Sequence, residues 1–133
     1  MARREGAWFP IDREGRPLTD EVYEATLGFH TNVAAVARGG RWSFIGADGR
    51  ALTEDWYDEV SNFVGDGLAV ARLGADFCFL DRATLLPVSA QRYAHATPPN
   101  SEGTAVVTDV SGGRARIHVR SGRVLYALPS VFA

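Results

Sequence analysis

The hydrophobic positions of the chain fall in short runs that are separated by polar turns rich in glycine. Four runs carry the pattern Gly-x-Trp-x-Phe-Ile or a variant of it, and three others are apolar almost throughout. They cover residues 6–11, 40–45, 75–80 and 113–118, and residues 33–38, 68–72 and 104–107, respectively. Such runs are typical of β-strands, whereas helical periodicity has little support beyond a single turn in each polar connector. The pattern predicts an all-β, antiparallel protein of about eleven strands.

The chain also repeats itself with a period of 34 residues. Between residues 6–38 and 40–72, 13 of the 33 compared positions are identical, where chance would give about two. The longest identical stretch is Ala-Val-Ala-Arg, at residues 35–38 and 69–72. A third unit follows with insertions, and a fourth is incomplete. We therefore expect a single domain of about three and a half repeats. The expected units are about 6–39, 40–74, 75–112 and 113–127.

Each unit is predicted to contain three strands in the same order. The Trp-containing strand comes first and is followed by a turn such as Asp48-Gly49, and then by a short second strand at 50–53. An acidic connector that contains tyrosine leads to the apolar third strand. The turn glycines Gly15, Gly49 and Gly122 are predicted to have the positive φ that tight hairpin turns require. A curved array of hairpins is the favoured architecture, and closure into a propeller-like or barrel-like body is the alternative.

The succession of Gly-x-Trp-x-Phe-Ile, Asp-Gly-Arg, Tyr-Asp-Glu-Val and Gly-Leu-Ala-Val-Ala-Arg within residues 40–72 resembles the bacterial WG-repeat family. The resemblance covers residues 6–88 well and 89–125 weakly. It departs from the family at the dipeptide Trp-Gly that gives the family its name. The corresponding residues here are Trp8-Phe9, Trp42-Ser43 and Phe77-Cys78. A glycine permits close approach of a neighbouring backbone or ring, so this contact is expected to differ here. The resemblance implies a repeat-built surface for interaction.

Aromatic residues that recur with the period are predicted to form the core, because each unit must bury its apolar face against the next. They are Trp8, Trp42, Phe44, Tyr23, Tyr57, Phe29 and Phe63. Trp56 differs, since its counterpart is Val22 and it stands among acidic residues. We expect Trp56 to be partly exposed and available to a partner.

Composition limits the classes of protein to which the chain can belong. Its 133 residues are 46% hydrophobic and 23% charged, and the net charge is −2, as in ordinary globular domains. No apolar run approaches the length of a membrane span, and the first residues do not resemble a signal peptide. Cys78 is the single cysteine and has no disulfide partner, which favours a reducing cytoplasm. The acidic balance argues against nucleic acid as a partner.

No arrangement of side chains predicts a catalytic residue, a metal ligand or a cofactor. The three histidines, His30, His95 and His118, lack the short spacings of zinc sites. Cys78 stands on an apolar strand, where a buried and inert thiol is expected. The acidic residues of the connectors recur at the same place in successive units. A catalytic pair of carboxylates needs two different environments, so these acids are interpreted as solvated connectors.

The last predicted strand carries the clearest functional pattern. Alternation places Arg114, Arg116, His118 and Arg120 on one face, and no acidic residue follows Asp109. One interpretation is an ordinary edge strand whose charges prevent strand addition or pair with the acidic connectors. The other is a docking stripe for an acidic protein, a phosphorylated ligand or, least favoured of the three, nucleic acid.

These patterns favour a non-catalytic protein-interaction module of the cytoplasm, such as a small adaptor or neutralising protein, without a cofactor and with a protein as partner. The candidate binding residues are Arg114, Arg116, His118, Arg120 and Trp56. The alternative is a small hydrolase-like enzyme with its site in a cleft between repeats. A deep pocket with two or more polar groups that break the repeat pattern would favour the enzyme.

Overall fold

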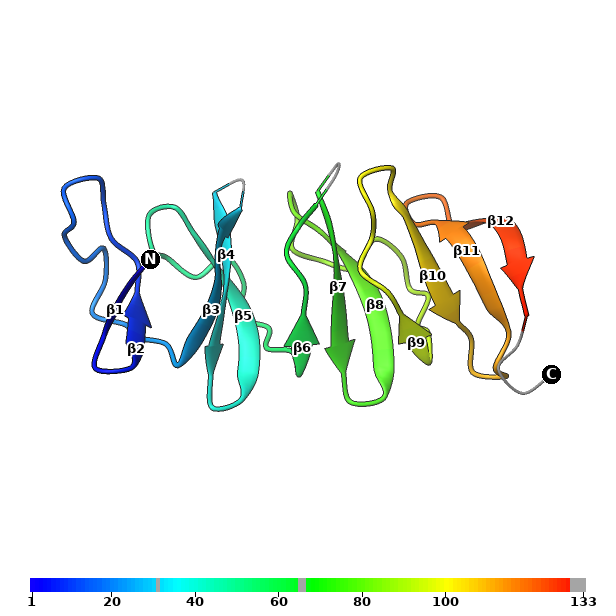
Figure 1. Cartoon of the computed structure of the whole chain (residues 1–133), viewed down its shortest axis with the longest axis horizontal. Helices are drawn as coiled ribbons and strands as arrows, with labels where there is room; N and C mark the ends of the chain where they lie inside the picture. Colours follow the sequence, from blue (N-terminus) through cyan, green and yellow to red (C-terminus); the bar gives the residue numbers. More distant parts are fainter. Residues whose placement is uncertain (31, 65–66, 130–133) are drawn as a thin grey trace. The chain divides into compact units, whose positions relative to one another are not determined.

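The computed structural model describes residues 1–30, 32–64 and 67–129. These residues form twelve β-strands in small antiparallel sheets, and they contain no helix (Figure 1). The predicted all-β class is therefore confirmed. The chain divides into two compact units, Met1–Asn62 and Phe63–Ala133, which are described separately.

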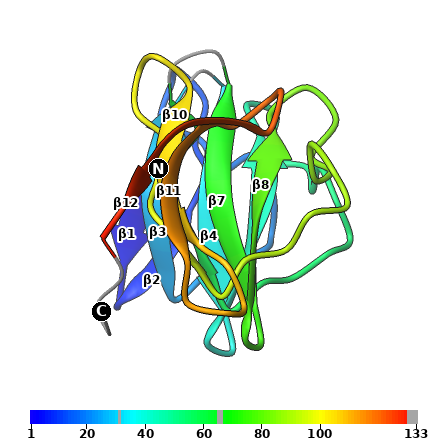
Figure 2. The same ribbon diagram turned by 90° about the vertical axis from the view of Figure 1, so that its right-hand side faces the viewer.

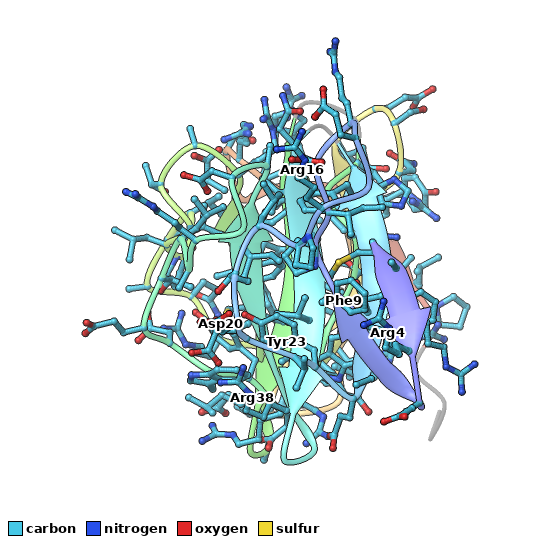
Figure 3. All side chains as sticks on the ribbon, turned by 90° about the vertical axis from the view of Figure 1, so that its left-hand side faces the viewer. Arg4, Phe9, Arg16, Asp20, Tyr23 and Arg38 are labelled. Atoms are coloured by element: carbon cyan, nitrogen blue, oxygen red, sulfur yellow. The ribbon has the colours of Figure 1, made fainter. Side chains whose placement is uncertain are left out.

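The first unit contains a two-stranded hairpin, a three-stranded sheet and one further short strand. The hairpin consists of β1 (Ala2–Arg4) and β2 (Ala7–Phe9), and the sheet has the order β3 (Ala25–His30), β4 (Val33–Arg38), β5 (Arg41–Gly46). β6 spans Glu59–Val60. A hydrophobic core contains Tyr23, Ala34, Val36 and Ile45. At the rim of this core the guanidinium carbon of Arg38 lies 4.7 Å from the ring centre of Tyr23 (Figure 3).

The second unit consists of one hairpin and one four-stranded sheet. The hairpin pairs β7 (Leu68–Leu73) with β8 (Asp76–Asp81). The sheet has the order β12-β11-β10-β9, formed by β12 (Arg123–Leu128), β11 (Arg114–His118), β10 (Thr104–Thr108) and β9 (His95–Ala96). Figure 2 views this sheet from the side of β12. The hydrophobic core includes Leu68, Val70, Phe79, Ala105, Val107 and Ile117, so it joins the hairpin to one face of the sheet.

The same hydrogen-bonded contact recurs three times along the described chain. In each case an aromatic residue near the start of a strand exchanges two backbone hydrogen bonds with a tyrosine of the following connector. The pairs are Trp8 with Tyr23, Trp42 with Tyr57, and Phe77 with Tyr93, at N···O distances between 2.7 and 3.0 Å. The connector therefore folds back on the strand that precedes it, which holds the tyrosine ring against the sheet.

The predicted aromatic core is confirmed for Tyr23, Phe44, Tyr57 and Phe63, which are buried, and Phe29 packs against the core of the first unit. Trp8 and Trp42 are only partly buried. Trp42 is the second residue of β5 and lies next to the hairpin turn. Burial along this strand begins at Ser43 and continues to its end. In β5 the two residues beside the turn are therefore less buried than the rest of the strand.

The turn glycines have the predicted backbone conformation. φ is +81° at Gly15 and Gly49 and +72° at Gly122, in the left-handed region that glycine adopts without strain. Gly49 is also closely packed, because a Cβ atom placed there would lie 2.9 Å from Cβ of Leu18. The turn at Gly49 therefore requires glycine for two separate reasons.

The second strands predicted for the first three units and the helical turns predicted for the connectors are wrong for the described residues, whereas the strand predicted after Gly122 is present as β12. Residues 50–53 make only an isolated bridge, between Ala51 and Ile45. Beyond this bridge, Oγ1 of Thr53 accepts a hydrogen bond from the N–H of Asp55, and the first connector forms the same kind of turn. Side chains that bind the backbone in this way favour turns over strands and helices.

The two Ala-Val-Ala-Arg stretches have different registers. Ala35 is paired with Phe44, so these side chains share a face, but its sequence counterpart Ala69 is paired with Leu80. Leu80 corresponds to Ile45 rather than to Phe44. A shift of one residue moves every side chain of a strand to the other face. The shift is tolerated because β4 and β7 are buried on both faces and consist largely of alanine and valine.

Candidate binding surface

The sheet of the second unit has two chemically different faces. Antiparallel partners share a face, so the paired residues Ala105 and Ile117 lie together on the side of the hydrophobic core. The opposite face carries Arg114, Arg116 and His118 of β11, as predicted. Their cross-strand partners on this face include two apolar residues, Val106 of β10 and Leu128 of β12. We define the polar face as the polar residues among them: Thr104 and Thr108 of β10, Arg114, Arg116 and His118 of β11, and Arg123 and Tyr126 of β12.

The two arginines of β11 bind neutral groups. Arg116 donates from Nε to the hydroxyl of Tyr126 at 2.9 Å and from Nη1 to Oγ1 of Thr104 at 3.1 Å. Arg114 donates from Nη1 to the carbonyl oxygen of Pro129 at 3.4 Å. Within the part of the chain that the structure describes, neither guanidinium group forms an ion pair with a carboxylate. Two positive charges are thus held on one face without being neutralised.

Two predictions about this strand are wrong. β11 is not an edge strand, because β10 and β12 flank it. Arg120 does not lie on the polar face, because β11 ends at His118 and the chain turns there, with Val119 buried in the core. Nη2 of Arg120 instead lies 2.8 Å from Oδ1 of Asp81. Arg120 therefore serves the structure of the second unit.

The contact with Arg120 also controls the protonation of Asp81. Burial on its own raises the pKa of the Asp81 carboxyl group. The hydrogen bond and the charge of Arg120, with the N–H groups of Ala83 and Thr84, outweigh burial and lower this pKa below its ordinary value. Both N–H groups lie 3.1 Å from Oδ2 of Asp81. The ionised carboxylate thus fixes the turn after β8 and neutralises Arg120.

The remaining residues of the polar face lie at its border with β12. Nδ1 of His118 is 2.8 Å from Oγ of Ser121, in the turn that leads to β12. Arg123 is exposed and is the cross-strand partner of His118, while Tyr126 is the partner of Arg116. The repeat predicts a strand after Gly122, but neither Arg123 nor Tyr126 was named as a candidate. Alternation alone separates these two residues, because they are three positions apart, and the bulge between β11 and β12 brings both to the polar face.

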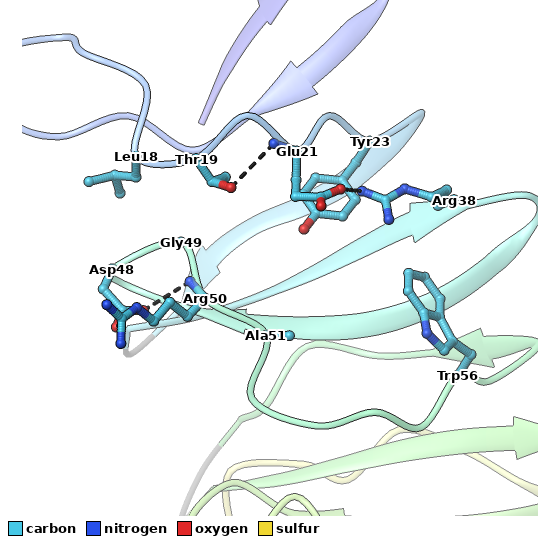
Figure 4. A pocket seen from close by; sticks show the side chains of 10 residues that line it. All are labelled: Leu18, Thr19, Glu21, Tyr23, Arg38, Asp48, Gly49, Arg50, Ala51 and Trp56. Atoms are coloured by element: carbon cyan, nitrogen blue, oxygen red, sulfur yellow. Dashed lines mark hydrogen bonds and ion pairs between the residues drawn. The ribbon is translucent and has the colours of Figure 1, made fainter.

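Trp56, the fifth candidate, lies in the first unit and is partly exposed, as predicted. It lines an open hollow of about 570 Å³ on this unit (Figure 4). The other lining residues are Leu18, Thr19, Glu21, Tyr23, Arg38, Asp48, Gly49, Arg50 and Ala51. Glu21 and Arg38 form an exposed ion pair of 2.6 Å within the hollow. The hollow therefore combines one partly exposed aromatic ring with charges that already neutralise each other.

The polar residues of the hollow follow the repeat pattern of the sequence. Asp48 and Arg50 correspond to Glu14 and Arg16 of the preceding unit, and Glu21 has an acidic counterpart too. Burial raises the pKa of the Tyr23 hydroxyl, with Arg38 opposing this change and Glu21 adding to it, so this phenol is neutral at neutral pH. Among the polar and aromatic lining residues, Trp56 alone breaks the pattern.

The described residues include few groups suited to metal binding or to nucleophilic catalysis. Across residues 1–30, 32–64 and 67–129, no group of three or more His, Cys, Asp or Glu side chains could hold a metal ion. Cys78 is buried, and burial raises the pKa of its thiol, which disfavours the reactive thiolate. Its side chain points away from the face that carries Phe77 and Phe79, as predicted.

No protein-family model matches the chain, and no curated protein matches it significantly. The described residues contain no helix with the length and apolar character needed to span a bilayer. The polar face and the Trp56 hollow are thus the features on which a function can be based.

Proposed function

We propose that this chain is a non-catalytic protein-interaction module that binds an acidic protein through its polar face, as a small adaptor or neutralising protein does. The observation that carries the proposal is the state of Arg114 and Arg116. Neutral acceptors fix both guanidinium groups, and no carboxylate of the described chain pairs with them. Charges of this kind accelerate encounter with an oppositely charged partner. The net charge of −2 disfavours nucleic acid, and the expected location is the cytoplasm.

We further propose that the chain is an open array of WG-like repeats. The 34-residue period and the recurring backbone contacts of Trp8, Trp42 and Phe77 with the following tyrosines support this architecture. In a repeat array each unit supplies the same framework, so a few exposed substitutions in one unit create a binding surface without disturbing the others. Arg116, which stands where the second unit has Ser43, is a substitution of this type.

A hydrolase-like enzyme, the alternative, has less support. The hollow beside Trp56 is open, and its carboxylates occupy positions that recur in other units. General acid–base catalysis by two carboxylates requires environments that separate their pKa values. Trp56 alone departs from the pattern, and an exposed tryptophan is more useful for binding than for proton transfer.

The proposal is tested by removing both charges. The double variant Arg114→Ser/Arg116→Ser is expected to keep the circular dichroism spectrum of the native protein. It is also expected to fail to capture the protein that the native chain captures from lysate. A matched control, Arg13→Ser/Arg16→Ser, changes two exposed arginines of a turn and is expected to retain capture. Capture by the native chain should also weaken as salt rises from about 50 to about 500 mM. A folded double variant that captures the same protein, identified by mass spectrometry, contradicts the proposal.

A further inference from the structure

We propose that the partner contributes an extended segment that adds as a strand along the free edge of β12 and alternates acidic with apolar residues. This inference rests on the proposed function and specifies the chemistry of the partner. Three features of β12 and its surroundings carry it: the open edge, the reach of the arginines on one face, and a mostly apolar hollow that borders the edge.

β12 is the outermost strand of its sheet, with β11 as its only neighbour among the described strands. Five of its six residues are exposed. The exposed fractions are 59% for Val124, 43% for Leu125 and 52% for Tyr126. An edge strand offers unpaired N–H and C=O groups to another strand, and exposed apolar side chains on such an edge mark a site of association.

The guanidinium groups of the polar face extend across β12 toward this edge. Arg116 belongs to β11, yet its Nε binds the hydroxyl of Tyr126 on β12. Arg114 similarly reaches the carbonyl oxygen of Pro129, the residue that follows β12. Arg123 is a residue of β12 itself. Every second side chain of an added strand points to this face, so acidic residues there come within reach of all three charges.

A hollow of about 390 Å³ borders the same edge, and its lining is mostly apolar but also includes Gln91, Asp109 and Arg114. Tyr93, Ile117 and Val124 are among its lining residues. Ile117 and Val124 are cross-strand partners, so the hollow lies directly beside the edge strand. The residues of an added strand that alternate with the acidic ones point to the face that carries Ile117 and Val124, where burial of apolar side chains stabilises the complex.

A second copy of this chain fits the edge less well. An antiparallel pair of two β12 strands keeps the polar faces of both copies on the same side of the joined sheet. The arginines of one copy then approach those of the other, and like charges across neighbouring strands disfavour the pairing. An acidic, alternating segment replaces this repulsion with attraction.

The test uses the whole chain and a defined probe, the fluorescein-labelled peptide acetyl-Glu-Val-Glu-Val-Glu-Val-Glu-amide, with fluorescence anisotropy as the readout. We expect saturable binding that weakens with salt. A peptide with lysine in place of glutamate reverses the charges and keeps the backbone. Two further peptides carry N-methyl groups on the glutamate or on the valine amides, and one of them blocks the amides that face β12. Charge reversal and this methylation are each expected to weaken binding by roughly tenfold or more.

Two variants locate the site on the protein. Arg116→Gln removes the charge that reaches over β12 and is expected to weaken binding of the acidic peptide by roughly tenfold. Arg13→Gln is the matched control in an exposed turn and is expected to leave the affinity unchanged. The peptide series on the native chain keeps the test valid even if Arg116→Gln disturbs folding.

Three outcomes overturn the inference. Equal binding of both N-methylated peptides excludes strand addition, even if charge reversal abolishes binding. Failure of the acidic peptide to bind, while Arg114→Ser/Arg116→Ser still abolishes capture of a lysate protein, overturns this inference alone and leaves the proposed function intact. A dimer that excess acidic peptide does not dissociate, measured by analytical ultracentrifugation, assigns the edge to a second copy.

Discussion

The hairpins β4–β5 and β10–β11 have the same antiparallel pairing but differ on one face. In β5 the position before Phe44 is Ser43, which is buried and is paired with Val36 of β4. Its counterpart in β11 is Arg116, which carries a charge on a partly exposed side chain and is paired with Val106 of β10. One backbone framework therefore presents either a packing face or a charged face. The side chains, rather than a change of fold, distinguish the unit that carries the proposed binding surface.

The charged face does not weaken the core of the second unit. Ile117 and Val107, on the other side of the same two strands, are 3% and 5% exposed. Because the side chains of a strand alternate between faces, one face can change while the other keeps its packing. The difference between the two hairpins can be tested by substitutions in their strands and turns.

The largest expected effect is at Phe44, which is 1% exposed. Phe44→Ala leaves a cavity and should lower the free energy of unfolding by about 3–5 kcal/mol. Arg116→Ala, on the other hairpin, removes hydrogen bonds from a partly exposed side chain and should cost less than about 1 kcal/mol. Urea unfolding of both variants measures the difference. Equal losses would show that the two faces are packed alike.

The turns that follow β5 and β11 give the next comparison. Gly49→Ala and Gly122→Ala both place a side chain at positive φ, which costs about 1 kcal/mol. At Gly49 the new Cβ also lies 2.9 Å from Cβ of Leu18, whereas at Gly122 nothing lies within 4 Å. We expect Gly49→Ala to cost roughly 1–2 kcal/mol more than Gly122→Ala. Thermal unfolding tests this, and identical melting temperatures would contradict it.

A smaller effect separates the structural arginine from those of the polar face. Asp81→Asn removes the carboxylate that pairs with Arg120, and this partly exposed pair should contribute about 1 kcal/mol at neutral pH. The pKa of Asp81 is lowered in the folded state. Its contribution is therefore present above the ordinary titration range of aspartate and is lost as the pH falls below about 4. Urea unfolding at neutral pH and at about pH 2.5 checks this expectation, which a pH-independent difference would refute.

The smallest expected effect is at Arg114. Among the described residues its side chain makes one hydrogen bond, a long one to the carbonyl oxygen of Pro129, so Arg114→Gln should change the free energy of unfolding by less than about 0.5 kcal/mol. Denaturant unfolding beside the native chain measures this change. A loss well above 1 kcal/mol would assign Arg114 to the structure, as Arg120 is, and would remove it from the polar face.

Features that depend on neighbouring residues could be predicted from the sequence. The apolar strand at 33–38 and the positive φ of Gly49 follow from a short apolar run and an Asp-Gly turn. The common face of Arg114, Arg116 and His118 follows from the alternation of any strand. These predictions required no knowledge of the tertiary contacts.

Features that depend on distant contacts could not be predicted. Arg120 pairs with Asp81, which lies far away in the sequence, and no local spacing indicates this contact. The sequence match placed Ala69 in the register of Ala35, yet hairpin pairing gave it the other face. β12 had no full counterpart in the earlier units, so Tyr126 was missed. Tertiary packing and hairpin register decided each of these cases.

The difference in register between β4 and β7 has a consequence for the evolution of the chain. Small apolar side chains line both sides of these strands, so either set of alternate residues fits on either side. The gain or loss of one codon before such a strand exchanges the faces to which its side chains point. This exchange creates neither a buried charge nor a large cavity. Units that differ in length by one residue can therefore both form a folded hairpin. Two copies of one tetrapeptide then come to lie on opposite sides of equivalent sheets.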